Sequence, residues 1–222
     1  MSRTEFGVES QSESTDGNRS LGKALALSPV LHTLIGMSVV SIVGWTVRQS
    51  GGGAAFALRQ PVLLPWWELP LSVYAHADPS HLLGNAVIVV LAGGLVSLRA
   101  SLPRFHAFFV GSGMLAGVAQ VAVSDALSAG TAVSSSVLGA SGAALALVGY
   151  IASSNRLSST VLRGVPRYVV VLIALAVAAV TTVYFSGGGV GRVGYVAHFI
   201  GALLGVLAGH RNALRPGSAT SR

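Results

Sequence analysis

The sequence predicts an all-α membrane protein, a bundle of six spanning helices with both termini in the cytoplasm. The first observation is composition: 52% of the 222 residues are hydrophobic and 9% are charged, whereas a soluble domain carries about 25% charged residues. The second is the recurrence of apolar runs of about 20 residues, the length of helix that crosses a bilayer. The third is the sorting of basic residues between alternate connections, which sets the orientation.

The chain opens with a polar segment, residues 1–27, which holds four of the seven acidic residues among Ser, Thr, Gly and Gln. We expect a disordered cytoplasmic tail, because such a segment has too little apolar surface to bury. It is unlike a signal peptide, since its acidic residues precede the first apolar run. The predicted six-span domain covers residues 28–212, and residues 213–222 form a short cytoplasmic tail.

Six apolar runs predict the spans. Every backbone amide in lipid must be bonded internally, and the alternating pattern of a membrane barrel is absent, so each run is expected to be a helix. The fourth run is short and the sixth is rich in glycine. The spans lie at roughly 29–47, 80–98, 105–124, 141–154, 168–185 and 194–210.

The basic residues fix the orientation. With the N-terminus inside, eleven of the 14 fall in inner segments, in agreement with the positive-inside rule. The inner ones are Arg3, Arg19, Lys23, Arg99, Arg104, Arg156, Arg163, Arg167, Arg211, Arg215 and Arg222, and the outer ones are Arg48, Arg59 and Arg192. Beyond the tail, the acidic residues Glu68, Asp78 and Asp125 also fall outside. We expect a multi-pass protein of the plasma membrane.

The composition also removes several kinds of chemistry. Without cysteine the chain has no disulfide, thiolate nucleophile or cysteine-bound metal. Its basic residues are scattered singly, without the basic stripe of a nucleic-acid interface. No charged residue sits at the centre of a span, which disfavours a proton relay or ion pump. The membrane interior therefore offers no carboxylate as the third member of a serine–histidine–aspartate triad.

The first outer connection, residues 48–79, is far longer than the usual link between bundled helices. It contains Trp66 and Trp67 between two prolines. One interpretation is an aromatic belt at the lipid headgroups. The other is a loop partly sunk into the outer leaflet that shapes access to a site. The two are compatible.

Ser141 opens the short fourth span. A helix of its 14 residues is about 21 Å long, against a hydrocarbon core of about 30 Å, so Ser141 is expected about 9 Å below the outer surface. Irregular backbone at that depth is tolerated around a water-filled cavity. Gly139 and Gly142 leave room for a substrate backbone. Taken alone, a serine near a helix start is most often a cap.

His198 lies six residues past Arg192, which also places it about 9 Å below the outer surface if the segment is helical. A serine and a histidine at one level on adjacent spans can meet. The backbone N–H groups at the start of the fourth helix would favour a developing anion. Gly201 and Gly205 begin a ridge of small residues that would press this helix against its neighbour. A lone membrane histidine is otherwise most often a packing residue.

His81 and Asn85 are four residues apart, so they share one face of the second helix. Both could donate hydrogen bonds to an oxyanion formed on Ser141. His76 precedes the helix and is expected to hold the loop. A metal bound by His76, His81 and His198 is disfavoured, because no carboxylate lies nearby in the membrane to complete the site.

These residues resemble the motifs of the rhomboid intramembrane serine proteases, over about residues 28–212. The second span carries His76-x4-His81-x3-Asn85, the fourth begins with Gly139-Ala140-Ser141-Gly142, and the sixth carries Ala197-His198-x2-Gly201-x3-Gly205. The resemblance implies a six-helix rhomboid-like bundle. Two positions depart from the family pattern: Leu145 replaces a common aromatic residue, and Trp67-Glu68 replaces a common Trp-Arg pair.

The resemblance implies an endopeptidase without a cofactor, in which Ser141 is the nucleophile and His198 its general base. His81, Asn85 and the Ser141 amide would stabilise the oxyanion, and Gly201 and Gly205 would seat the sixth helix on the fourth. Its partners would be single-span membrane proteins and the lipid bilayer, with no nucleic acid. Six spans could suffice as a monomer. The alternatives are a catalytically silent relative that escorts membrane proteins and, less favoured because no internal repeat is present, a small transporter.

Overall fold

A computed structural model describes residues 28–52, 55–128, 136–154, 169 and 194–215. The predicted N-terminal tail lies outside these residues, and so does the fifth predicted span except for residue 169. The described elements are α2 (Pro29–Gln49), β1 (Leu58–Arg59), α3 (Glu68–Tyr74), α4 (Pro79–Ile88), the π-helix η1 (Val89–Gly93), α5 (Gly94–Ser97), α6 (Leu102–Leu127), β2 (Ser136–Val137), α7 (Ser141–Ser154) and α10 (Tyr195–His210).

Polar caps followed by proline fix where two of the long helices begin. Ser28 accepts a hydrogen bond from the Leu31 amide at the start of α2 (3.3 Å). Asp78 accepts one from the His81 amide at the start of α4 (2.9 Å). Each cap satisfies a first-turn N–H group that has no partner within the helix. The Ser80 hydroxyl and the His81 amide also lower the pKa of Asp78.

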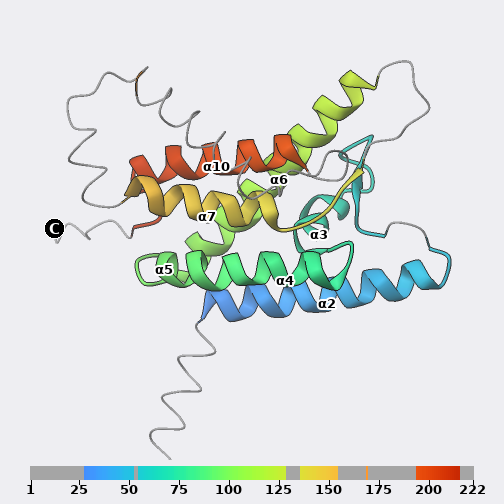
Figure 1. Ribbon diagram of the computed structural model, residues 1–222, viewed down its shortest axis with the longest axis horizontal. Coiled ribbons are helices and arrows are strands. Elements are labelled where there is room, and N and C mark those ends of the chain that lie inside the picture. Colours follow the sequence, from blue (N-terminus) through green and yellow to red (C-terminus); the bar gives the residue numbers. More distant parts are fainter. Residues whose placement is uncertain (1–27, 53–54, 129–135, 155–168, 170–193, 216–222) are drawn as a thin grey trace, which may run out of the picture.

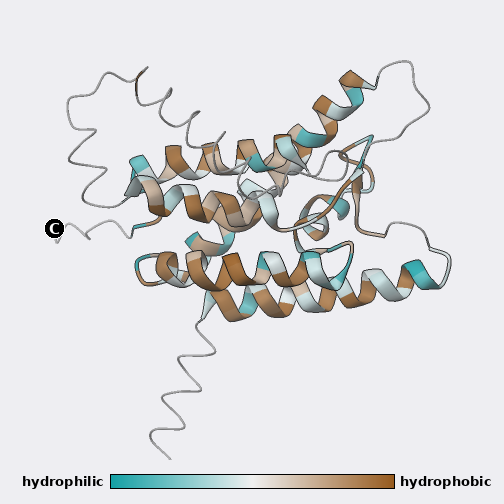
Figure 2. Ribbon diagram, in the orientation of Figure 1, coloured by the Kyte–Doolittle hydropathy of each residue, from teal (hydrophilic) through white to brown (hydrophobic). Residues whose placement is uncertain are grey.

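Among the described residues, three helical segments are long and apolar enough to cross a membrane: α2, the continuous α4–η1–α5 segment over Pro79–Ser97, and α6. They correspond to the first three predicted spans. The fourth and sixth predicted spans are the shorter apolar helices α7 and α10. In Figure 2, α2 is mostly hydrophobic along its length and hydrophilic at its C-terminal end.

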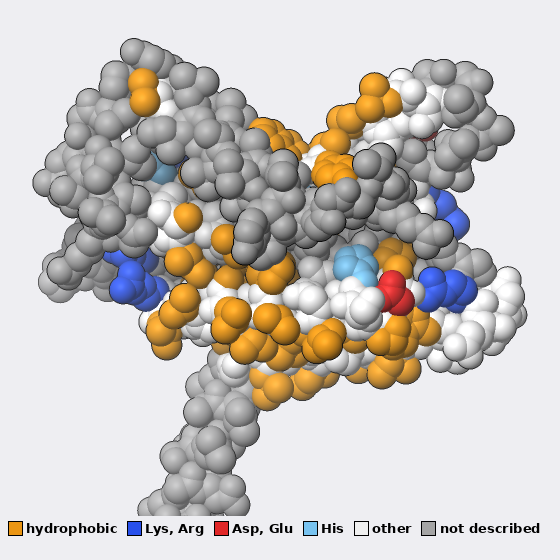
Figure 3. Space-filling view, in the orientation of Figure 1, with side chains coloured by type: hydrophobic (Ala, Val, Ile, Leu, Met, Phe, Trp, Pro, Cys, Tyr) orange, Lys and Arg blue, Asp and Glu red, His pale blue; other side chains and the backbone are white. Residues whose placement is uncertain are grey.

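The outward faces of α2 and α4–η1–α5 are apolar. Figure 3 shows hydrophobic side chains spread over this side of the molecule. Lipid would solvate such a face, whereas water would not. The exposed side chains include Ile35, Val39 and Ile42 on α2, and Leu83, Val87, Leu91 and Leu95 on the α4–η1–α5 segment.

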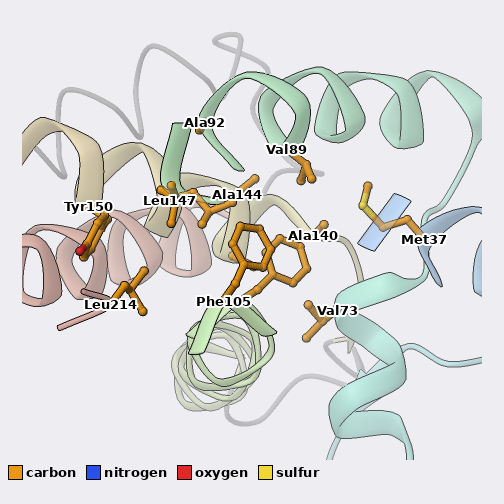
Figure 4. Close-up of a cluster of buried hydrophobic side chains, with 13 residues drawn as sticks. Met37, Val73, Val89, Ala92, Phe105, Ala140, Ala144, Leu147, Tyr150 and Leu214 are labelled. Carbon is orange, nitrogen blue, oxygen red and sulfur yellow. The ribbon is translucent and has the colours of Figure 1, made fainter. Parts of the chain in front are cut away.

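In Figure 1, α7 and α10 lie side by side, α2 runs along α4, and α6 crosses obliquely. Phe105 and Phe109 of α6 stack with their rings 6.3 Å apart at the centre of the core, and neither is exposed. Figure 4 shows how α7, η1, α2 and α3 surround Phe105. The core residues labelled there are Met37, Val73, Val89, Ala92, Phe105, Ala140, Ala144, Leu147, Tyr150 and Leu214.

Glycine lets α7 and α10 pack backbone to backbone. An ideal Cβ on Gly201 would lie 2.7 Å from the carbonyl carbon of Gly142 and 2.9 Å from its Cα. One turn further along, a Cβ on Gly205 would lie 2.8 Å from the carbonyl carbon of Ala146. Real carbon–carbon contacts are about 3.5–4.0 Å, so a side chain at either position would push the helices apart.

The connection between α2 and α4 and the segment that leads into α7 meet in a small sheet that the sequence does not predict. Leu58 pairs with Val137 and Arg59 with Ser136 in an antiparallel ladder between β1 and β2. Arg59 also forms an ion pair of 2.9 Å with Glu68, whose side chain is 5% exposed. The connection between α2 and α4 is therefore tied to the strand that leads into Ser141.

Candidate active site

Ser141 and His198 lie within hydrogen-bonding distance. The Ser141 Oγ is 2.8 Å from the His198 Nε2. Ser141 is the first residue of α7 and His198 lies in the first turn of the adjacent α10, so each side chain comes from the same end of its helix. A hydroxyl at this distance from an imidazole nitrogen can pass its proton to that nitrogen.

The backbone before Ser141 is held on both sides. Gly139 has φ +127°, a conformation that side chains rarely adopt, and its amide donates to the Ser72 carbonyl (2.8 Å). An ideal Cβ on Gly139 would lie 2.7 Å from Cε1 of His81. Glycine at this position therefore permits both the turn and the close approach of the His81 ring.

His81 and Asn85 share the cavity with Ser141 and His198. The cavity has a volume of about 1110 Å³, and all four side chains line it. Asn85 is 4% exposed. Its Nδ2 has no hydrogen-bond partner among the described residues. A buried donor left unpaired costs about 1–3 kcal/mol, so the Asn85 amide is free to donate to an acceptor that enters the cavity.

A second serine–histidine pair lies nearby, but it is sealed in the protein. The Ser41 Oγ is 3.0 Å from the His76 Nδ1, and Ser41 is 0% exposed. The Tyr74 carbonyl also lies 3.0 Å from the His76 Nδ1, and the Ala140 amide donates to its Nε2 (3.4 Å). Neither Ser41 nor His76 is among the residues that line the cavity.

The contacts of His76 fix its protonation state. Because Nε2 accepts a hydrogen bond from an amide, the ring must be neutral with its proton on Nδ1. Burial, and then the nearby His81, lower the pKa of His76 to about 4. In this state His76 links α2, through Ser41, to the residue that precedes Ser141.

The two departures from the family pattern have physical explanations. Leu145 is 1% exposed and packs with Ala202, Phe199 and Leu203 on α10. An aliphatic side chain therefore fills the space between α7 and α10. Glu68, where the family commonly has arginine, pairs with Arg59, so its buried carboxylate has a counterion.

One contact at the site is not predicted by any pattern in the sequence. Gln120 of α6 accepts hydrogen bonds through Oε1 from the amides of Val196 (3.0 Å) and Ala197 (3.1 Å) at the start of α10. A glutamine in an apolar run was the only available signal, and it does not specify a partner 76 residues away. Within the described residues no group of three or more His, Cys, Asp or Glu side chains could hold a metal ion.

Comparison with known protein families shows which family the chain belongs to. Residues 64–212 match the family model of the rhomboid domain. The match begins before α3, in the middle of the connection over residues 48–79, and runs through α10, so it includes Ser141, His198, His81 and Asn85. No curated protein matches the chain. Since the matched segment covers more than half of the sequence, the chain is a member of the rhomboid family, an integral multi-pass membrane protein.

Proposed function

We propose that the protein is an intramembrane serine endopeptidase that acts through a dyad of Ser141 and His198. The observation that carries the proposal is the 2.8 Å distance between the Ser141 Oγ and the His198 Nε2 on the wall of a large cavity. The sealed Ser41–His76 pair offers no such access. The rhomboid family includes serine proteases of this kind.

In the proposed reaction, the Ser141 Oγ attacks the carbonyl carbon of a peptide bond while the His198 Nε2 takes its proton. The imidazolium then gives that proton to the leaving amine as the C–N bond breaks. The remaining acyl group is bound to Ser141 as an ester. A water molecule, deprotonated by the same imidazole, hydrolyses the ester and restores the serine. The mechanism requires neutral His198 with its proton on Nδ1 at the start.

The negative charge that forms on the carbonyl oxygen needs donors aimed at its position. His81 and Asn85 line the same cavity as Ser141. The unpaired Nδ2 of Asn85 is a donor already desolvated, so it gains most when the oxyanion forms. The Ser141 amide, at the N-terminal end of α7, lies where the helix dipole also favours negative charge.

We further propose six spans, with both termini in the cytoplasm and the cavity reached by water from the outer side of the plasma membrane. The substrates are single-span membrane proteins, cleaved within or next to their spanning helix. Peptide bonds in an intact helix are protected by its hydrogen bonds, so small or helix-breaking residues in the substrate would expose the reactive carbonyl.

Cleavage of a labelled single-span protein by the purified protein in liposomes tests the proposal. We expect cleavage by the wild type and none by Ser141→Ala or His198→Ala. Ser97→Ala and His106→Ala are matched controls outside the cavity lining and should retain activity. Binding without cleavage by the wild type would favour the escort alternative, and activity that survives in either dyad variant would refute the dyad.

A further inference from the structure

The first turn of α10 lacks a cap of its own. A helix begins with N–H groups that have no partner within it, and an N-terminal side chain usually accepts from the second or third of them. α10 begins at Tyr195 and is preceded by Gly194, which has no side chain to do this. The amides in need of an acceptor are those of Val196 and Ala197.

Gln120 supplies that acceptor from another helix. Its Oε1 accepts from both amides, at 3.0 Å from Val196 and 3.1 Å from Ala197. The other end of the same amide group donates to the Ser124 Oγ (2.8 Å), one turn further along α6. This bond sets which way the amide faces, because only its oxygen can accept from the two backbone groups.

The capped turn is the one that carries the proposed base. His198 directly follows Ala197, and its own amide bonds to the Gly194 carbonyl (2.8 Å). Three residues later, Gly201 contacts Gly142, so the same helix is held from α7. The imidazole thus lies between two anchors, one on α6 and one on α7. Removing the Gln120 bonds would let the first turn of α10 fray, while the contact between Gly201 and Gly142 stays in place.

We propose that Gln120 is a positioning residue, which caps α10 in trans and thereby holds His198 at hydrogen-bonding distance from Ser141. This role rests on the proposed protease function, although the capping itself does not. Effective catalysis depends on placement to within about 1 Å, and a misplacement of that size can cost about 100-fold in rate. No sequence motif marks this residue. Its side chain on α6 bonds to backbone amides of α10, and any residue at those α10 positions except proline would supply them.

Two substitutions of Gln120 distinguish the effect of the hydrogen-bond acceptor from the effect of side-chain size. Gln120→Met keeps the length of the side chain and removes the acceptor, so we expect kcat to fall about 10- to 100-fold with little change in KM. Gln120→Glu keeps an acceptor oxygen and should retain activity within about threefold. Gln49→Met makes the same chemical change at an exposed position on α2 and should leave kcat unchanged.

The pH profile provides a readout that mere packing would not move. A carboxylate at position 120 would stabilise an imidazolium at His198, so Gln120→Glu should shift the acidic limb of kcat to higher pH. The titratable side chain of α4 that faces the same imidazole is His81, and this variant leaves it in place. α6 faces the site with Gln120 and α7 with Ser141, neither of which titrates near neutral pH.

Hydrogen exchange at the Val196 and Ala197 amides tests the cap independently of cleavage. We expect faster exchange in Gln120→Met and wild-type protection in Gln120→Glu and Gln49→Met. Unchanged exchange in Gln120→Met would overturn the capping. Faster exchange with an unchanged kcat would overturn the positioning role while leaving the proposed protease intact. If the wild type never cleaves, the proposed protease function is refuted. The exchange rates would still show whether Gln120 caps α10.

Discussion

Replacing Gly201 by alanine is expected to separate the dyad without touching either of its members. The added methyl group would lie 2.7 Å from the carbonyl carbon and 2.9 Å from the Cα of Gly142. Both are backbone atoms of the residue next to Ser141, so no side chain can rotate to make room. The two helices must therefore move apart.

The size of that movement follows from the contact distances. Carbon atoms in contact sit about 3.5–4.0 Å apart, so α10 must shift by about 1 Å relative to α7. His198 lies one turn from Gly201 on α10, and a shift of this size would lengthen its 2.8 Å distance to Ser141 beyond hydrogen bonding. We expect kcat to fall about 100-fold and the free energy of unfolding to fall by about 1–3 kcal/mol.

Cleavage of a single-span substrate and thermal unfolding in detergent measure the two effects. Gly205→Ala creates a similar clash against Ala146, one turn further from the dyad. We expect it to lose similar stability but less activity than Gly201→Ala. Gly111→Ala on α6 is the matched control, because a Cβ there meets nothing within 4 Å. Wild-type kcat in Gly201→Ala would refute the claim that close helix packing sets the distance between the two side chains.

Two further predictions concern the histidines and the asparagine around the site. Asn85→Ala and His81→Ala should each lower kcat about 10- to 1000-fold if both side chains donate to the oxyanion, and unchanged rates would assign them to packing. The pKa of about 4 for buried His76 lies below its value of about 6.5 in the unfolded chain, so between these values the unfolded state binds more protons. Stability should therefore fall as pH drops from about 6.5 to 4, by up to about 3 kcal/mol from this residue. Unfolding at pH 7 and pH 5 should differ less in His76→Gln than in the wild type, and an equal difference would contradict the neutral state of His76.

The main elements could be predicted from the sequence because lipid imposes a simple rule. A segment that must bond all its own amides and face hydrocarbon is an apolar helix, so α2, α6 and α7 follow from composition and length. The short α7 could even be given its first residue, since Ser141 stands at the head of the fourth apolar run. The spacing of Gly201 and Gly205 also predicts close packing of the sixth helix on a neighbour, and the resemblance to the rhomboid proteases implies that this neighbour is the fourth helix.

The contacts between connections could not be predicted in the same way. The β1–β2 ladder joins segments 78 residues apart, and two-residue strands carry no periodicity to detect. The Arg59–Glu68 pair depends on how the loop folds back on itself. For the same reason the link from Ser41 through His76 to Ala140 was hidden, since each partner comes from a different part of the chain.

The residues of the candidate site were easier to predict than the residues that hold them in position. Ser141 and His198 were expected at one depth because helix rise converts sequence distance into depth. Gln120 was missed because a cap provided by another helix leaves no local pattern, unlike Ser28 or Asp78, which precede the helices that they cap.

The most direct test of the central claim is labelling by a fluorophosphonate probe, with the modified residue identified by mass spectrometry. Activation of Ser141 by His198 predicts that the probe bonds to the Ser141 Oγ in the wild type and in Ser41→Ala, and that His198→Ala loses the label. Equal labelling of Ser141 with and without His198, or labelling at Ser41 instead, would contradict the account.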